Sequence, residues 1–179
     1  MSGKKDKNKK LHVGCGENNI NGWINADLQS NIADIELDAR KTFPFRKNSI
    51  SYIYNEHFIE HLTKNEGVFF LSECYRILKP NGILRISTPN LRWLAMRYLN
   101  KELIAIGGWK PKSPCDMFNE AMKLWGHQYV YDEDQLTFAL MNAGFKNVYP
   151  CKYKESKDKN LDSIENRPFN NELIYEAVK

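Results

Sequence analysis

Apolar residues recur along this chain with two different spacings. In the segment 64–78 they return every three or four positions, which is the spacing of one face of a helix. Elsewhere they form short runs bounded by turn residues, as buried strands do. The helix face consists of Val68, Leu71, Tyr75 and Leu78, and Pro80 cannot continue it.

The strand-like runs alternate with helical segments. Two runs close the chain, and we expect them to pair antiparallel to each other. Alternation of strands and helices is typical of a mostly parallel sheet, so the pattern predicts an α/β fold. The expected strands are 11–14, 23–27, 32–37, 50–54, 83–88, 148–153 and 172–178.

A second clear helix is predicted over residues 133–143. Asp132 and Gln135 form a start that resembles a capping box, and Gly144 ends the helix. The preceding region is less regular. We expect it to hold helices near 91–103 and 117–125 around a break at Gly107-Gly108.

The basic excess of the chain is confined to its N-terminus. Residues 1–10 hold five lysines and one aspartate, which accounts for the whole formal charge of +4. The remaining 169 residues balance 21 basic against 21 acidic side chains. We therefore expect a disordered basic tail over residues 1–10, a single domain over 11–179, and no nucleic-acid partner.

Other features of the composition narrow the class of protein. No apolar run approaches the ~20 residues that span a bilayer, and the N-terminus lacks the apolar stretch of a signal peptide. The four cysteines include no C-x-x-C pair. This pattern predicts reduced thiols in a cytoplasmic protein rather than disulfides or a zinc knuckle.

A glycine turn follows the first predicted strand. Gly14 and Gly16 let the backbone bend sharply, and a ligand can approach it closely because side chains are absent there. The third glycine of a dinucleotide fingerprint is replaced by Asn19, and no P-loop G-K-[ST] is present. NAD and nucleoside triphosphates are therefore disfavoured.

Polar residues end the next three strands. Asp27 ends the second strand, where a carboxylate can accept both ribose hydroxyls of an adenosine, and Asp38 ends the third, near an adenine amino group. Asn55-Glu56-His57 ends the fourth. Open α/β sheets bind ligands at this edge.

Taken in order, these segments resemble the class I S-adenosylmethionine-dependent methyltransferases of the broad type-11 group. The resemblance covers about residues 10–90. A narrower resemblance, carried by Gly22–Asn25 and Leu161–Glu165, is to small methyltransferases associated with polysaccharide biosynthesis. The matching segments are Leu11–Gly16, Asn25–Leu28, Leu37–Ala39, Phe43–Phe45, Glu56–Leu62 and Arg76–Leu84.

The resemblance implies the strand order 3-2-1-4-5-7-6, the cofactor S-adenosylmethionine and methyl transfer to a small-molecule or saccharide acceptor. It places the glycine turn, with Cys15, against the methionine part of the cofactor. It also places Asp27 and Leu28 at the ribose and Asp38 with Ala39 beside the adenine. Asn55, Glu56 and His57 are expected near the sulfonium.

The chain departs from the family pattern in its first two crossovers. Residues 16–23 are too few for a full helix, and 28–31 leave almost nothing between the second and third strands. One hypothesis is that cofactor binding is weakened, which would make the chain a non-catalytic module. A second is that a bare part of the sheet is covered by the tail or by a second subunit in a homodimer.

The histidines offer further hypotheses. His57-x-x-Glu60-His61 matches an inverted zinc-peptidase motif, which leaves a zinc hydrolase as a minor alternative. If the chain is a methyltransferase, His57 lies beside the cofactor or acceptor, and His61 packs at a helix start. His127 is the preferred general base because its ordinary pKa is near neutrality.

The region after the fifth strand supplies candidate acceptor contacts. Tyr131 is expected to assist His127 or to pack. Arg92 and Arg97 are expected either to meet an anionic acceptor such as a nucleotide sugar or to form surface ion pairs. Trp93, Trp109 and Trp125 can stack on a sugar or pack in the core.

Overall fold

The structure, a computed structural model, describes residues 8–105, 108–167 and 171–179. One sheet runs through it in the order β3-β2-β1-β4-β5-β7-β6, and β7 is antiparallel to both of its neighbours. The predicted α/β fold, the strand order and the antiparallel closing pair are therefore confirmed. The strands are β1 (Lys10–Val13), β2 (Ile24–Asp27), β3 (Ile35–Glu36), β4 (Ile50–Glu56), β5 (Leu78–Thr88), β6 (Asn147–Pro150) and β7 (Leu173–Val178).

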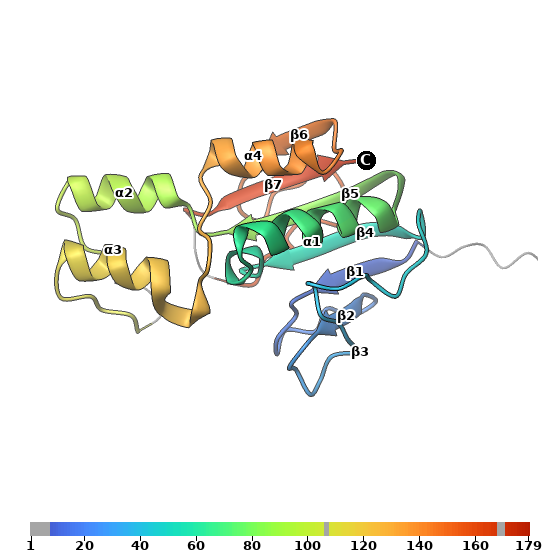
Figure 1. Cartoon of the computed structure of the whole chain (residues 1–179), viewed down its shortest axis with the longest axis horizontal. Helices are drawn as coiled ribbons and strands as arrows, with labels where there is room; N and C mark the ends of the chain where they lie inside the picture. The colour runs from blue at the N-terminus through green and yellow to red at the C-terminus, as the bar shows by residue number, and fades with distance from the viewer. Residues whose placement is uncertain (1–7, 106–107, 168–170) are drawn as a thin grey trace, which may run out of the picture.

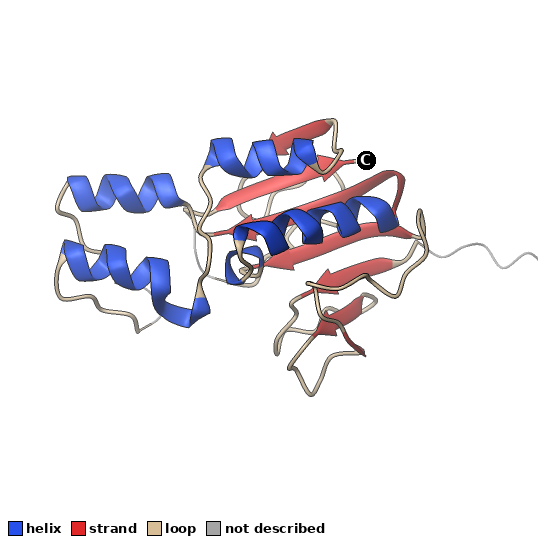
Figure 2. Ribbon diagram, viewed as in Figure 1, coloured by secondary structure: helices blue, strands red, loops and turns tan. Residues whose placement is uncertain are grey.

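Two helices, α1 (Lys64–Ile77) and α4 (Glu133–Asn142), lie side by side on one face of the sheet (Figures 1 and 2). Thr63 and Glu66 start α1 with a reciprocal capping box, which the sequence analysis missed. Asp132 caps α4 by accepting a hydrogen bond from the backbone N–H of Gln135 at 2.8 Å, as predicted.

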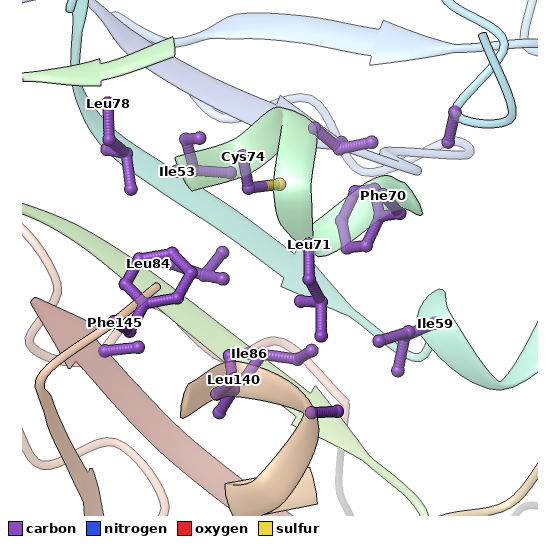
Figure 3. Packing of buried hydrophobic residues seen from close by; sticks show 14 of the residues in the cluster. Ile53, Ile59, Phe70, Leu71, Cys74, Leu78, Leu84, Ile86, Leu140 and Phe145 are labelled. Carbon is purple, nitrogen blue, oxygen red and sulfur yellow. The ribbon is translucent and has the colours of Figure 1, made fainter. Parts of the chain in front are cut away.

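The main core lies between these helices and the sheet (Figure 3). Alternate strand residues such as Ile53, Leu84 and Ile86 face the helices and are fully buried against Leu71 and Leu140. Burial of each such side chain stabilises the fold by about 1.5–3 kcal/mol. This core fixes β4 and β5, whose carboxyl ends carry the site.

The opposite face of the sheet is covered by the chain itself. The β6–β7 connection, described over residues 151–167 and 171–172, buries Leu161 against Trp23 and Tyr54. Arg85 of β5 also faces this side, where it is fully buried and forms ion pairs with Glu165 and Glu176. The connection thus takes the place of the helices that the shortened crossovers lack.

A helical arm extends past the carboxyl ends of the strands (Figure 1). It consists of α2 (Leu91–Leu99), α3 (Pro114–Lys123) and the short 3₁₀ helix η2 (Leu124–Gly126). Its apolar side chains form their own small core around Leu94, Ile104 and Met117. Among the described residues, no helix has the length and apolar character needed to cross a bilayer.

Some predicted boundaries were wrong. β3 has two residues rather than six, because only Ile35 and Glu36 pair with β2. β5 begins at Leu78 rather than Ile83, since Leu78 already pairs with Ile50 across an irregular step. Helices α2 and α3 cover 91–99 and 114–123 rather than 91–103 and 117–125, and Gly107 of the expected break lies outside the described residues.

The last residues of the predicted N-terminal tail belong to the sheet. Lys10 belongs to β1, and the carbonyl oxygen of Lys9 accepts hydrogen bonds from the backbone N–H groups of Ser51 and Tyr52. The first seven residues of the predicted tail lie outside the described residues.

Candidate functional site

The glycine turn lies at the carboxyl end of β1 and is held against β2. The backbone N–H groups of Gly14 and Cys15 both donate to the carbonyl oxygen of Ala26, at 2.8 and 3.2 Å. Gly14 has φ +70°, and a Cβ there would lie 2.2 Å from the ring of Phe58. Gly16 has φ +52° and open space beside it, which leaves room for a ligand.

Asp27 lies beside this turn, as predicted, and organises it. One carboxylate oxygen accepts from the N–H of Gly16 at 2.9 Å, and the other accepts from the N–H groups of Gln29 and Ser30 at 2.8 and 3.0 Å. Leu28, which follows, is exposed. Asp27 therefore joins the glycine turn to the β2–β3 connection at the ligand-binding edge.

The predicted adenine-side residues differ from each other in environment. The Asp38 carboxylate accepts hydrogen bonds from the Arg40 guanidinium at 2.8 and 3.0 Å, and these hold its pKa well below the usual range. Ala39 is buried in the core. A ligand that used the Asp38 carboxylate would have to share it with Arg40.

Asn55 and Glu56 end β4 and face opposite sides of the sheet. The amide nitrogen and oxygen of Asn55 are fully buried and find no hydrogen-bond partner among the described residues. Glu56 accepts hydrogen bonds from the backbone N–H groups of Asn166 and Arg167 at 3.1–3.2 Å. The carboxylate of Glu56 thus anchors the β6–β7 connection.

His57 lies between two carboxylates, with a left-handed backbone at φ +50°. Nε2 donates to Glu172, and Nδ1 lies 3.2 Å from Oε1 of Glu60. Burial alone would lower the pKa of His57, but the two carboxylates outweigh it and raise the pKa to about 9. His57 is therefore a cation at neutral pH, which argues against a role as general base and against zinc ligation through His57.

His127, in contrast to His57, is neutral. Its Nδ1 lies 2.9 Å from the carbonyl oxygen of Ala121, and because a carbonyl only accepts, Nδ1 carries the proton. Burial lowers the pKa of His127, so the ring stays neutral with a lone pair on Nε2. His61 does not pack at a helix start on the sheet. It lies in the 3₁₀ helix η1 (Ile59–His61) with its ring centroid 5.1 Å from that of His127.

A cavity of about 640 Å³ separates the helical arm from the carboxyl ends of β4 and β5. Its polar wall includes the three histidines of this region, His57, His61 and His127. Its apolar wall includes Trp93, Trp109 and Trp125, the three tryptophans that the sequence analysis considered for sugar stacking. The fold therefore brings residues from the region after β5 next to the end of β4.

Other predicted acceptor residues lie elsewhere. Arg92 pairs with Glu133 and Asp134, and Arg97 pairs with Glu102, so both form the surface ion pairs that were the alternative expectation. Tyr131 is buried in the main core, with its hydroxyl next to Gly67 of α1.

The sequence analysis missed two cavity residues, Arg167 and Glu172. Both come from the β6–β7 connection, more than 100 residues from β4, and no motif marks them. Glu172 was expected only as the start of a strand. Its pairing with His57 depends on how the connection crosses the sheet.

Comparison of the sequence with known proteins points to one class of enzyme. A family model described as "Methyltransferase domain" matches residues 25–86. A protein of Mycobacterium tuberculosis named a probable S-adenosylmethionine-dependent methyltransferase is 27% identical over 124 residues, which cover 69% of this chain and 34% of that protein. The matched segment therefore resembles a methyltransferase domain of the class that the sequence analysis expected. The comparisons support the family, the enzyme class and the cofactor predicted from the sequence.

Solved structures agree on the fold of this chain. An S-adenosylmethionine-dependent methyltransferase of Archaeoglobus fulgidus superposes with a TM-score of 0.61 at 16% identity, over 96% of this chain and 86% of that one. Phosphoethanolamine N-methyltransferase 2 of Haemonchus contortus, solved with S-adenosylmethionine, gives 0.58 at 15% identity, over 96% of this chain and 48% of that one. The chain spans about a third of the length of the curated M. tuberculosis relative.

Proposed function

We propose that this chain transfers the methyl group of S-adenosylmethionine to a small-molecule or saccharide acceptor bound in the cavity beneath the helical arm. The observation that carries the proposal is the position of that cavity. It begins at His57, directly after β4, and β4 is the sheet neighbour of β1, which leads into the glycine turn. A donor bound across β1 and β2 would meet an acceptor in the cavity at the end of β4.

We assign the binding of the methyl donor, S-adenosylmethionine, to the glycine turn and to the residues that follow β2 and β3. The turn Gly14-Cys15-Gly16 would pass the methionine part, with the open space at Gly16 admitting the ligand. Asp27 and Leu28 would contact the ribose, and Asp38 with Ala39 would border the adenine. Asp27 keeps acceptor capacity for hydroxyl groups, since carboxylate oxygens carry about four lone-pair sites in total.

The end of β4 would lie near the sulfonium. Asn55 has an unpaired, buried amide there, and an unpaired polar group in a native structure indicates a missing partner. Glu56 would act indirectly, because its carboxylate holds Asn166 and Arg167. His57 would contribute a fixed positive charge rather than a base.

Methyl transfer requires mainly that the donor and the acceptor are held in line. S-adenosylmethionine supplies an activated methyl group on a sulfonium, so the chain has to hold donor and acceptor in line. The neutral His127 offers its Nε2 lone pair to the cavity and would accept the proton that the acceptor releases. His127 is therefore retained as the proposed catalytic base, whereas His57 is proposed to position and polarise.

The acceptor wall favours a ligand with an apolar face. The tryptophan rings present flat surfaces, and aromatic side chains bury large areas in ligand pockets. Carbohydrate rings offer C–H faces of this kind together with hydroxyl groups for methylation. This supports a saccharide as the first acceptor class to screen, and the link to polysaccharide biosynthesis stays a proposal of the same kind.

Calorimetric titration with S-adenosylmethionine and S-adenosylhomocysteine tests the proposal. We expect dissociation constants between about 1 and 100 μM, or about −8 to −5.5 kcal/mol. Absence of heat up to millimolar ligand, with no thermal stabilisation, would favour a non-catalytic module instead. The short β1–β2 connection and the Asp38–Arg40 pair are the observations that favour that second candidate.

Two further properties are proposed from the sequence. We infer a cytoplasmic location, and the four cysteines are all free thiols, which is compatible with it. A homodimer that covers bare sheet would use the β3 side, where Leu28 and Ile32 are exposed, because the β6–β7 connection covers the sheet near β4 and β5. Light scattering on the purified protein tests the dimer.

A further inference from the structure

Three side chains that can ligate a metal gather beside the cavity: the buried Glu60, and His61 and His127, which line it. One ligand atom from each lies within 4.8 Å of the others, and Nε2 of His127 lies 4.0 Å from Oε1 of Glu60. We propose that these three residues bind a divalent transition-metal ion of the Zn²⁺ type. The set differs from the sequence motif His57-x-x-Glu60-His61, because His127 takes the place of His57.

The backbone holds the two contributing segments together. The N–H groups of Gln128 and Tyr129 both donate to the carbonyl oxygen of Glu60, at 2.7 and 3.1 Å. Glu60 and His61 are consecutive in η1, and His127 directly precedes Gln128. The three ligands therefore stand on two short segments fixed to each other without any contribution from the side chains themselves.

His127 is prepared as a ligand. Its Nδ1–H donates to the carbonyl oxygen of Ala121 at 2.9 Å, which leaves the Nε2 lone pair directed toward Glu60. Histidines that bind metals almost always use this arrangement, in which the second ring nitrogen donates to a carbonyl or carboxylate. A histidine bonded in this way needs no change of tautomer to accept a cation.

Glu60 supplies the charge. Its side chain is fully buried, and one oxygen, Oε2, accepts from the hydroxyl of Thr88 at 2.9 Å. The other, Oε1, has no hydrogen bond among the described residues, although it lies 3.2 Å from Nδ1 of His57. Oε1 therefore pairs with His57 on one side and keeps a lone pair that a cation on the other side can use.

Binding requires a small contraction. Ligand atoms around a tetrahedral Zn²⁺ lie roughly 3.4 Å apart, because the metal–ligand distances are about 2.1 Å. Nε2 of His127 and Oε1 of Glu60 are 4.0 Å apart, and no pair of ligand atoms exceeds 4.8 Å, so the three side chains would move together by roughly 1 Å.

Three protein ligands leave one coordination position, and both histidines line the cavity, so this position faces the proposed acceptor. The role in acceptor binding rests on the proposed function: the ion would hold an acceptor oxygen and lower its pKa. His127 would then act through the ion instead of taking the proton itself. Metal binding as such does not depend on S-adenosylmethionine.

The test uses untagged, chelator-treated full-length protein. We expect Zn²⁺ titration in a calorimeter and Co²⁺ titration followed by visible absorption to show one ion per chain. His61→Gln and His127→Gln should each weaken Co²⁺ binding by about 100-fold or more. Trp93→Phe, which changes the same cavity without touching a ligand, should leave it unchanged within about twofold.

Each outcome decides the question. Absence of Zn²⁺ and Co²⁺ binding at millimolar ion, or binding that both histidine variants retain, overturns the site. Near-UV circular dichroism identifies a variant that has lost its packing, and in that case Glu60→Gln, which keeps the size of the side chain, replaces it with the same expected loss. S-adenosylmethionine titration of the same samples keeps the two proposals separate, because it can fail while the metal binds, or succeed while it does not.

Discussion

Arg85 and Glu165 form a fully buried ion pair although they lie 80 residues apart, with 2.5 Å between Nε and Oε1. Arg85 belongs to β5, which lies between β4 and β7 in the sheet, and Glu165 belongs to the β6–β7 connection. Glu176 of β7 accepts from the same guanidinium at 2.6 Å. The pair therefore joins the back of the sheet to the segment that covers it.

Removal of Glu165 should destabilise the fold strongly. Glu165→Ala leaves a buried guanidinium with Glu176 as its remaining carboxylate, and breaking a buried pair by removing one partner costs about 3–5 kcal/mol. We expect about 3 kcal/mol, the lower end, in urea unfolding. Glu155→Ala is the control, because Glu155 forms an exposed pair with Lys152 and should change stability by less than about 0.5 kcal/mol. Equal effects of the two substitutions would contradict a special role for Arg85.

The two glycines of the turn should respond differently to alanine. Gly14→Ala puts a Cβ into the ring of Phe58 at positive φ, so we expect a loss of about 3 kcal/mol of stability. Gly16→Ala meets no neighbour and should cost only about 1 kcal/mol for its positive φ. It should nevertheless lower affinity for S-adenosylmethionine, because the methyl group enters the open space. Calorimetry and urea unfolding on both variants give the two readouts, and undiminished affinity of Gly16→Ala would argue against the ligand passing there.

Asp27→Ala should abolish detectable cofactor binding. It should also cost about 1–2 kcal/mol of stability, because three backbone N–H groups lose their acceptor. Asp34→Ala is a matched control: Asp34 accepts from the backbone and side-chain nitrogens of Asn25 at 2.8 and 3.0 Å. That variant should lose similar stability and keep its affinity. The ribose assignment is wrong if the two variants bind S-adenosylmethionine equally well.

His12 should make stability depend on pH. His12 lies in β1, where it is buried beside Asn25 of β2 and Tyr54 of β4. Burial lowers its pKa to about 4, although the hydrogen bond with Asn25 and the charge of Asp27 partly oppose the shift. The unfolded chain has an ordinary histidine pKa of about 6.5, so it binds more protons between pH 6.5 and 4. The stability that comes from neutral His12 is therefore complete above pH 6.5 and is lost as pH falls toward 4, by up to about 3 kcal/mol.

The variant His12→Phe isolates this contribution. It keeps a ring next to Tyr54 but has no titrating group, so its stability should fall less than that of the parent protein between pH 7.5 and 4.5. Urea unfolding at several pH values measures the difference, which also cancels the carboxylates common to both proteins. Parallel pH profiles would show that folding does not lower the pKa of His12.

The geometry around the proposed donor site could be predicted from the sequence because its signals are local. A glycine turn after a short strand and an aspartate at the end of the next one are neighbours in the sequence. Parallel strands then bring Gly16 and Asp27 within hydrogen-bond distance. The capped helices were predicted for a similar reason, since their apolar spacing and end residues lie within single segments.

The acceptor side could not be predicted in the same way. His57 was expected to be a catalytic group, but Glu172 and Glu60 make it a cation, and Glu172 is 115 residues away. Glu56 was assigned to the cofactor, but its carboxylate binds the backbone of residues 166 and 167. The charge state of an imidazole and the partner of a carboxylate depend on packing across the sheet, which no local pattern encodes.

The sequence by itself determined the α/β fold, because spacing, turn residues and strand ends act over a few neighbouring positions, and its resemblance to a known family implied the strand order and the cofactor. Only the tertiary structure decided which face the β6–β7 connection covers and which histidine stays neutral. It alone brought Glu60, His61 and His127 together at one cavity. Burial and long-range charge pairs set these properties, and they exist only once β4, η1 and the helical arm have packed together.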